Sequence, residues 1–294
     1  MTIHTSFWTQ KRTFALFVIP GLSLYIVFNI CPIIMGFFYS MTDWNGYGKR
    51  YHFLGFQNYA EIFEDDRFRS ALLFNIKYSL FLVFFTVVLG MILALLLNGS
   101  FHGVGFFRSI YFFPAVLSML TVGLIFNQIY YRALPPFGKM ISSSLLSQSL
   151  LSRKNTAIIG VLFVHVWQGV ALPTVLFLSG LQSVPKELYE AADMDGITPF
   201  RKFFSITLPF MIPVLSVVLV LSLKSGIMVF DYIMSMTNGG PGGATESIAL
   251  LIYRHGFTED RFSYSIAEAI LAGIIIGSIS AIQITASNKR KVEV

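Results

Sequence analysis

Long apolar stretches separated by shorter polar segments dominate the pattern of this sequence. Within each stretch the apolar residues are nearly continuous over about 20 positions or more, whereas a half-buried strand would alternate apolar and polar residues. Backbone groups in lipid must be hydrogen-bonded within their own helix, so such runs predict an all-α membrane protein. We predict six transmembrane helices, at residues 13–40, 71–97, 106–127, 157–181, 208–230 and 264–286.

Composition agrees with insertion into a membrane. Hydrophobic residues make up 55% of the 294 positions and charged residues only 12%, against about 25% in ordinary soluble domains. The formal net charge is +6, but the basic residues are dispersed and lie mostly at the ends of apolar runs. That placement follows membrane topology, so nucleic-acid binding is not expected. The sequence contains one cysteine, Cys31, which excludes a disulfide within the chain.

Charge at the ends of the spans predicts the orientation of the chain. Lys11 and Arg12 precede the first span as in a signal peptide, but no small-residue cleavage site follows, so we predict an uncleaved helix. The segments on the side of the termini hold nine Lys and Arg in about 55 residues, and the other loops hold ten in about 90. The denser charge, with Lys289, Arg290 and Lys291 after the last span, predicts that both termini are cytoplasmic. Prolines within or near the spans predict kinks, at Pro20, Pro32, Pro114, Pro173 and Pro213.

The polar segment 183–209, between the fourth and fifth spans, carries consistent signals for two short helices. Ser183 is expected to cap the first helix, with Pro185 in its first turn. Gly196 is expected to end that helix in a left-handed conformation, and Thr198 with Pro199 to start a second one. From these signals alone, a capped helix that merely lies on the membrane surface remains a second interpretation.

The same segment contains a recognisable motif. Glu190-Ala191-Ala192, then Gly196, then Ile206-Thr207-Leu208-Pro209 resembles the EAA motif of the permease subunits of binding-protein-dependent ABC importers. The stretch from Arg108 to Pro114, Trp167 in the fourth span and residues 237–241 are also similar to the first of the two permeases of carbohydrate importers, such as those for maltose and glycerol-phosphate.

The resemblance implies a type I ABC importer fold with its core at residues 71–286, preceded by an N-terminal part at 1–70 and followed by a basic tail at 287–294. It implies a second permease chain, two cytoplasmic ATPase subunits, an extracytoplasmic solute-binding protein and a location in a prokaryotic plasma membrane. ATP and Mg²⁺ would be bound by the ATPases, and no cofactor by this chain. In that family the EAA segment docks into the ATPase, which here implicates Glu190, Ala191, Ala192, Asp195, Gly196, Ile206, Leu208 and Pro209.

No catalytic or metal site is expected in this chain. Gly138-Lys139-Met140 lacks the preceding glycine and the Ser or Thr of a nucleotide-binding P-loop. The five histidines are scattered, without the i, i+4 pairing of a zinc site.

Polar residues within the spans are candidates for the path of a sugar, which offers an apolar face and a rim of hydroxyl groups. Helix packing is the alternative for each of them, and Lys224 could instead pair with a carboxylate of a partner subunit. The candidates are His165, Trp167, Gln168, Asn127 and Lys224. Lys77 and Glu268 lie near span ends, where we expect them to reach the membrane surface.

Two glycine patterns indicate candidate contacts of the last span and of the last outer loop. Gly273 and Gly277 form a GxxxG pattern suited to close helix packing, within the chain or with the second permease. The glycine-rich segment 239–243 resembles the family segment that faces the binding protein, although an ordinary loop would have the same composition.

The favoured function is therefore the import of a sugar or oligosaccharide, with glycerol-phosphate or another polyol as an alternative substrate. A secondary carrier driven by an ion gradient is a rival, which Lys224 and Glu268 could serve, but it leaves the segment 183–209 unexplained. An intramembrane enzyme is a further rival that lacks a catalytic cluster in the sequence.

Overall fold

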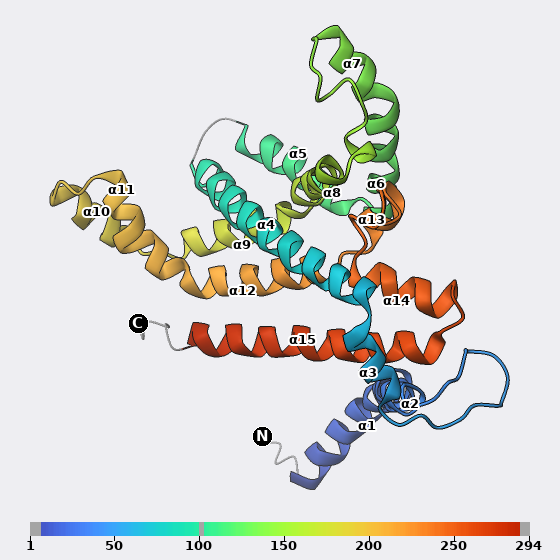
Figure 1. Ribbon diagram of the computed structural model, residues 1–294. Coiled ribbons are helices and arrows are strands. Elements are labelled where there is room, and N and C mark those ends of the chain that lie inside the picture. Colours follow the sequence, from blue (N-terminus) through green and yellow to red (C-terminus); the bar gives the residue numbers. More distant parts are fainter. Residues whose placement is uncertain (1–6, 100–102, 289–294) are drawn as a thin grey trace. The chain divides into compact units, whose positions relative to one another are not determined.

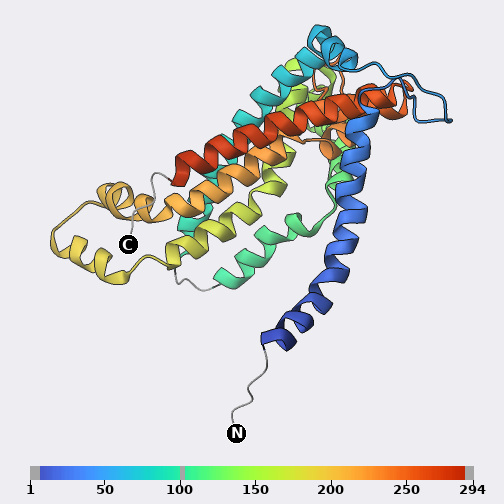
Figure 2. The same cartoon turned by 90° about the horizontal axis from the view of Figure 1, so that it is seen from below.

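The computed structural model describes residues 7–99 and 103–288, and helices are the regular elements of these residues, as predicted (Figures 1 and 2). The chain divides into two compact units. One unit holds the N-terminal residues up to Glu64 together with Ile252–Leu271, and the other holds Asp65–Leu251 and the residues from Ala272 onward. Lys289, Arg290 and Lys291, which carry the predicted basic flank, lie outside the described residues.

The first unit begins with one long apolar helical run. Helix α1 (Phe7–Tyr25) continues through a π-helical turn (Ile26–Ile30) into α2 (Cys31–Tyr39), and α3 (Gln57–Glu64) follows a loop. Pro32 is the second residue of α2, just beyond the π-helical turn, where its missing N–H is accommodated. The run is long and apolar enough to cross a membrane, which agrees with the first predicted span.

The same unit holds a buried acid–base pair that contradicts one prediction. Glu268 has no exposed surface, and its Oε2 lies 2.9 Å from Nδ1 of His255, which is 1% exposed. Glu268 therefore does not reach the membrane surface, because a carboxylate removed from water needs a hydrogen-bonding or charged partner. Glu259 approaches the other ring nitrogen of His255 at 3.6 Å.

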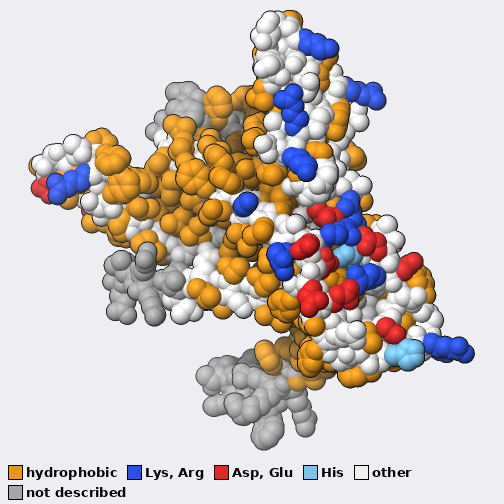
Figure 3. All heavy atoms as spheres, viewed as in Figure 1, with side chains coloured by type: hydrophobic (Ala, Val, Ile, Leu, Met, Phe, Trp, Pro, Cys, Tyr) orange, Lys and Arg blue, Asp and Glu red, His pale blue; other side chains and the backbone are white. Residues whose placement is uncertain are grey.

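The second unit is built on three helices that contact one another: α4 (Asp66–Leu97), α9 (Ala171–Gln182) and α12 (Leu208–Ile227). At Gly226 the backbone of α12 runs so close to α4 that an added Cβ would lie 2.6 Å from the Oγ of Ser79. Large apolar side chains cover the outward faces of these helices (Figure 3), as expected for surfaces that face lipid.

The remaining helices are α5 (Val104–Val116), α6 (Met119–Gln128), α7 (Leu134–Met140), α8 (Lys154–Gly169), α10 (Lys186–Met194), α11 (Pro199–Lys202), α13 (Asp231–Met236), α14 (Ile248–Phe257) and α15 (Phe262–Asn288). The last two of these helices cross the boundary between the units.

Two predicted spans are broken instead of straight. The third span, residues 106–127, is interrupted after Val116, and the helices on either side form an angle of 95°. The fourth span bends by 44° between α8 and α9. Pro114 and Pro173 lie near these two sites, whereas Pro213 lies inside α12, which continues past it. The described residues thus hold four helices able to cross a membrane, or six if each bent pair crosses once.

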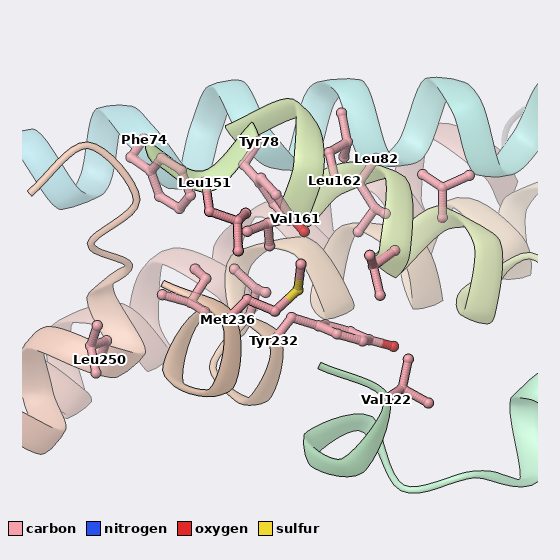
Figure 4. Close-up of a cluster of buried hydrophobic side chains, with 14 of the residues drawn as sticks. Phe74, Tyr78, Leu82, Val122, Leu151, Val161, Leu162, Tyr232, Met236 and Leu250 are labelled. Atoms are coloured by element: carbon pink, nitrogen blue, oxygen red, sulfur yellow. The ribbon is translucent and has the colours of Figure 1, made fainter. Parts of the chain in front are cut away.

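Buried apolar side chains from α4, α6, α8, α13 and α14 form the core of this unit (Figure 4). Tyr78, Val161, Tyr232 and Ile233 are each at most 2% exposed. This cluster holds α13, a short helix that crosses no membrane by itself, against the longer helices. It thereby fixes one wall of the cavity described below.

Candidate coupling segment and translocation cavity

The segment 183–209 folds as a helical hairpin between α9 and α12 (Figure 1). Helix α10 begins at Lys186 without a side-chain cap. The prediction that Ser183 caps it is wrong: the hydroxyl of Ser183 donates to the carbonyl oxygen of Gly180 at 2.7 Å and so closes the end of α9. Pro185 itself, in an extended conformation, occupies the cap position of α10.

Gly196 ends α10 as predicted. Its φ of +67° lies in the left-handed region, and the N–H of Ile197 donates to the carbonyl oxygen of Ala192 at 3.0 Å, the pattern of a glycine-terminated helix. The next helix starts at Pro199, after Thr198 in an extended conformation. The turn is therefore defined by backbone hydrogen bonds and by a glycine, which adopts the left-handed conformation without strain.

Cross-links between the two arms hold the hairpin together. Lys202 forms an ion pair with Asp193, and the hydroxyl of Tyr189 lies 2.9 Å from the Oγ1 of Thr207, which is buried. A π-helical turn (Phe203–Thr207) then leads without interruption into α12. The chain thus continues from the hairpin directly into a membrane-crossing helix.

The motif residues of the hairpin divide between its surface and its interior. Glu190, Ala191, Asp195 and Gly196 are exposed, whereas Ala192 is 3% exposed. Ala192 therefore packs inside the chain and is not part of the exposed surface of the hairpin. Residues further along the motif are partly buried at the base of α12, namely Ile206, Leu208 and Pro209.

Two exposed apolar residues of the hairpin were not identified from the motif. Met194 is 89% exposed and Phe200 is 75% exposed, one on each side of the Gly196 turn. Exposed apolar side chains mark a partner surface where they form a contiguous patch. The sequence shows that these two residues lie in a polar segment, but not that they are exposed.

The second candidate site is a cavity in the same unit, between α4, α8, α12 and α13. It has two adjoining lobes of about 240 Å³ and 260 Å³. The lobes share the side chains of Met119, His165, Leu221, Ser225 and Tyr232. Thr86, Gln168 and Ser222 line the first lobe, and Lys224 and Asp231 line the second. Apolar walls with a few polar groups are typical of sites for small molecules.

His165 is the buried polar centre of this cavity. Its Nδ1 lies 3.0 Å from the hydroxyl of Tyr78 and its Nε2 lies 2.9 Å from the Oγ of Ser225. The ring also packs against that of Tyr232, with centroids 4.6 Å apart. Each ring nitrogen thus has a hydroxyl partner, so His165 connects α4, α8 and α12 and contributes to the cavity wall.

Gln168 has a structural role beside the cavity. Its Nε2 donates to the carbonyl oxygens of Pro114 and Leu117, at 3.0 and 2.8 Å, and its Oε1 accepts a hydrogen bond from Tyr232 at 2.8 Å. Pro114 and Leu117 are the residues at which α5 ends. The Pro114 carbonyl oxygen also accepts the N–H of Leu117 at 3.2 Å, so the backbone group that depends on Gln168 at the helix break is the Leu117 carbonyl, which would otherwise be unpaired in the membrane.

Lys224 and Asp231 give the second lobe a charge of each sign. Lys224 is exposed to the cavity and Asp231 is half-buried. No salt bridge of Lys224 occurs among the residues that the structure describes. A cation inside a membrane-crossing helix is costly unless it faces water or a ligand, so its position at the cavity accounts for its presence.

Trp167 and Asn127 do not line the cavity. Trp167 faces a separate, apolar hollow of about 680 Å³ between α4, α5 and α8, and its ring packs against Phe126 at 5.3 Å. Asn127 donates through Nδ2 to the carbonyl oxygen of Met236 at 2.7 Å and so joins α6 to α13. For these two residues the structure supports packing, the alternative to a place on the substrate path.

Gly273 and Gly277 lie on an open stretch of α15. No described atom lies within 4 Å of a Cβ built at either position. Neither glycine is therefore used for close packing within the part of the chain that the structure describes, and packing against a second permease stays a prediction.

A helical membrane protein with a polar hairpin between two spans, and a cavity with a few polar groups among its helices, has the architecture of a transport permease. Residues 73–292 match the family of inner membrane components of binding-protein-dependent transport systems, and the chain belongs to this family.

Relatives match this chain over nearly its whole length. The multiple sugar-binding transport system permease protein MsmF of Streptococcus mutans is 42% identical over 276 residues, which cover 94% of this chain and 95% of that protein. The trehalose/maltose transport system permease protein MalF of Thermococcus litoralis is 31% identical, with 94% of each chain covered. The fold is similar to a chain of a bacterial alginate ABC transporter in complex with a periplasmic protein bound to an alginate pentasaccharide, with a TM-score of 0.83 and 20% identity over 97% of this chain and 98% of that one.

Proposed function

We propose that this chain is one of two permease subunits of an ABC importer for a neutral sugar or short oligosaccharide. In this proposal two ATPase subunits bind ATP and Mg²⁺ on the cytoplasmic side, and a solute-binding protein delivers the sugar on the other side. The chain itself is not catalytic, and both of its termini are cytoplasmic. The observation that carries the proposal is the hairpin at 183–209, which joins two membrane helices. Its two arms are held together by an ion pair and a hydroxyl contact, and its turn requires the left-handed conformation that Gly196 adopts.

Coupling in this proposal begins at the exposed surface of the hairpin. Glu190, Ala191 and Asp195 meet the ATPase, with the apolar side chains of Met194 and Phe200 beside them. Closure of the ATPase pair displaces α10, and the cross-links pass this displacement to α12. Since α12 supplies Leu221, Lys224 and Ser225 to the cavity, its movement changes access to the cavity.

The charges of the cavity favour a neutral substrate. A lone cation would favour glycerol-phosphate or another anion, but Asp231 lines the same lobe as Lys224. Together they offer both a donor and an acceptor for charge-assisted hydrogen bonds to sugar hydroxyl groups. Relatives named for multiple sugars and for trehalose and maltose support the same class of substrate.

An ion-coupled carrier is the second candidate, and two observations speak against it. Glu268, one of the two residues that could bind the coupling ion, is fully buried and hydrogen-bonded to His255. The hairpin at 183–209 would also have no role in an ion-coupled carrier, which has no ATPase subunit for it to contact.

The coupling is tested by one pair of glycine variants. Gly196 and Gly48 have φ of +67° and +74°, and no atom of the described residues lies within 4 Å of a Cβ built at either position. Gly196→Val and Gly48→Val therefore impose the same kind of backbone strain, but only Gly196 belongs to the hairpin. In vesicles that contain the assembled transporter, Gly196→Val should abolish ATP-driven uptake while Gly48→Val retains it. Equal uptake by both variants would contradict the coupling assignment.

A further inference from the structure

The segment 129–154 forms a hairpin with an unbalanced charge, which we call the outer hairpin. It consists of a π-helical turn (Ile129–Ala133), helix α7 and a return segment that ends at Lys154. Its charged residues are Arg132, Lys139, Arg153 and Lys154, and all four are exposed. The sequence has no Asp or Glu from residue 67 to residue 186, so no acid lies in the hairpin or its flanks. Figure 3 shows Lys and Arg side chains, and no Asp or Glu, over the region of α7.

Among the residues that the structure describes, these four cations have no anionic partner. Arg153 donates through Nη2 to the neutral side chain of Gln148 at 2.6 Å. None of the four takes part in a salt bridge with another described residue. The positive charge is therefore directed outward.

The outer hairpin is rigid enough to present a fixed surface. An added Cβ on Gly138 would lie 2.2 Å from the backbone of Leu146, so α7 and the return segment are in direct contact. Leu151 is 2% exposed, and the hydroxyl of Thr156 donates to the carbonyl oxygen of Leu150 at 2.6 Å, which ties the return segment to α8. Lys154 also lies beside the 239–243 turn, since a Cβ on Gly242 would be 3.2 Å from its Cε.

The position of the hairpin relative to the membrane rests on the proposed function. If the segment 183–209 is cytoplasmic, the outer hairpin is extracytoplasmic, because α8 and α9 together cross the membrane between them. Extracytoplasmic segments next to spans are normally poor in Lys and Arg. Four such residues without an acid oppose this tendency, so topology does not explain them and a binding role does.

We propose that the outer hairpin is the electrostatic docking surface for an acidic face of the solute-binding protein. The fold neighbour in complex with a periplasmic protein shows that this fold receives such a protein. Neutral sugars bring no charge to attract, so the cations act on the carrier protein. Their effect is to speed association, because exposed charges at an interface steer the encounter more than they hold the complex.

The test measures association of the binding protein with the complete transporter in nanodiscs of a zwitterionic lipid. One variant neutralises the surface (R132Q, K139Q, R153Q and K154Q), and a matched control retains every charge (R132K, K139R, R153K and K154R). We expect the neutral variant to lower the association rate constant by about tenfold or more at low ionic strength and to flatten its dependence on salt, with a smaller change in dissociation rate. The control should behave as the native protein. An equal melting temperature for all three proteins would show that they are folded alike.

Two outcomes would overturn this proposal. One is an association rate and salt dependence that are the same in the neutral variant and the native protein. The other is a difference between the neutral variant and the native protein that appears only when the nanodisc contains phosphatidylglycerol, with no difference in association of the binding protein. That result would identify lipid headgroups as the partner. Failure of the proposed function would give a different result: none of the three proteins would show ATP-driven uptake at any concentration of binding protein. If both proposals are correct, saturating binding protein restores uptake by the neutral variant.

Discussion

The hydroxyl of Tyr232 donates a hydrogen bond to Oε1 of Gln168 at 2.8 Å. This contact connects the cavity to the break between α5 and α6, because Nε2 of Gln168 donates to the carbonyl oxygens of Pro114 and Leu117. One amide side chain thus completes the hydrogen bonds of a broken membrane helix and positions a phenol in the cavity wall.

Replacement of Gln168 should destabilise the protein. Gln168→Leu removes the hydrogen-bond partner of the Leu117 carbonyl oxygen and of the Tyr232 hydroxyl, whereas the Pro114 carbonyl oxygen still accepts the N–H of Leu117. Each buried unsatisfied group costs about 1–3 kcal/mol. We expect a clearly lower melting temperature in detergent. Gln182→Leu is the matched control, because Gln182 is exposed at the end of α9, and it should leave the melting temperature nearly unchanged. Equal melting temperatures for the two variants would show that the break does not depend on Gln168.

The pair of His255 and Glu268 should show energetic coupling. His255→Gln and Glu268→Gln each remove one partner of a buried pair, which is strongly destabilising. The double variant should lose less stability than the sum of the single ones, with an interaction free energy of about 1–3 kcal/mol. The measurement is a double-mutant cycle on the free energy of unfolding. Glu259→Gln serves as the control, since Glu259 is partly exposed and 3.6 Å from His255, and simple additivity in the main cycle would contradict the assignment.

Lys224 should matter for transport and not for stability. It is exposed to the cavity, so Lys224→Met should change the free energy of unfolding by no more than about 0.5 kcal/mol while reducing uptake of a neutral sugar. Lys77→Met removes another exposed cation from a membrane helix, one that is absent from the cavity lining, and should leave uptake unchanged. The comparison uses initial uptake rates at equal amounts of inserted protein. If both variants lose uptake equally, Lys224 has no special place on the path.

Asp231 should determine the charge preference of the same lobe. Asp231→Asn leaves Lys224 as the only formal charge among the residues that line it. The ratio of uptake for an anionic sugar to uptake for its neutral counterpart should therefore rise, with the binding protein held constant. A ratio that does not change would show that the cavity does not select by charge.

The sequence predicts the helical fold well because its signals are local. A run of apolar residues long enough to cross a membrane specifies a helix without reference to the rest of the chain. The end of α10 at Gly196 was equally predictable, because a glycine with no Cβ is the usual residue for the left-handed conformation that ends a helix. The break after Val116 was predictable only in part. Pro114 predicts a kink nearby, but the angle of 95° depends on hydrogen bonds from Gln168 on another helix, which the sequence does not show.

The roles of the polar residues depended on partners that the sequence does not reveal. Glu268 appeared to lie near a membrane surface, but it is buried against His255, which belongs to the preceding helix. Trp167 and Gln168 are neighbours on α8 whose side chains point about 100° apart, and the sequence does not show which of the two faces the cavity. Ser183 likewise fits the cap of either adjacent helix, and only the position of the Gly180 carbonyl group decides between them.

The central claim, import of a sugar driven by ATP through partner subunits, is tested most directly by uptake into sealed vesicles. The vesicles would contain this chain with its second permease and ATPase subunits, and uptake of a panel of labelled neutral sugars would be measured with and without ATP and binding protein. We expect uptake of at least one sugar that requires both ATP and the binding protein and that does not respond to an imposed proton or sodium gradient. Uptake that follows an ion gradient in the absence of ATP would contradict this account.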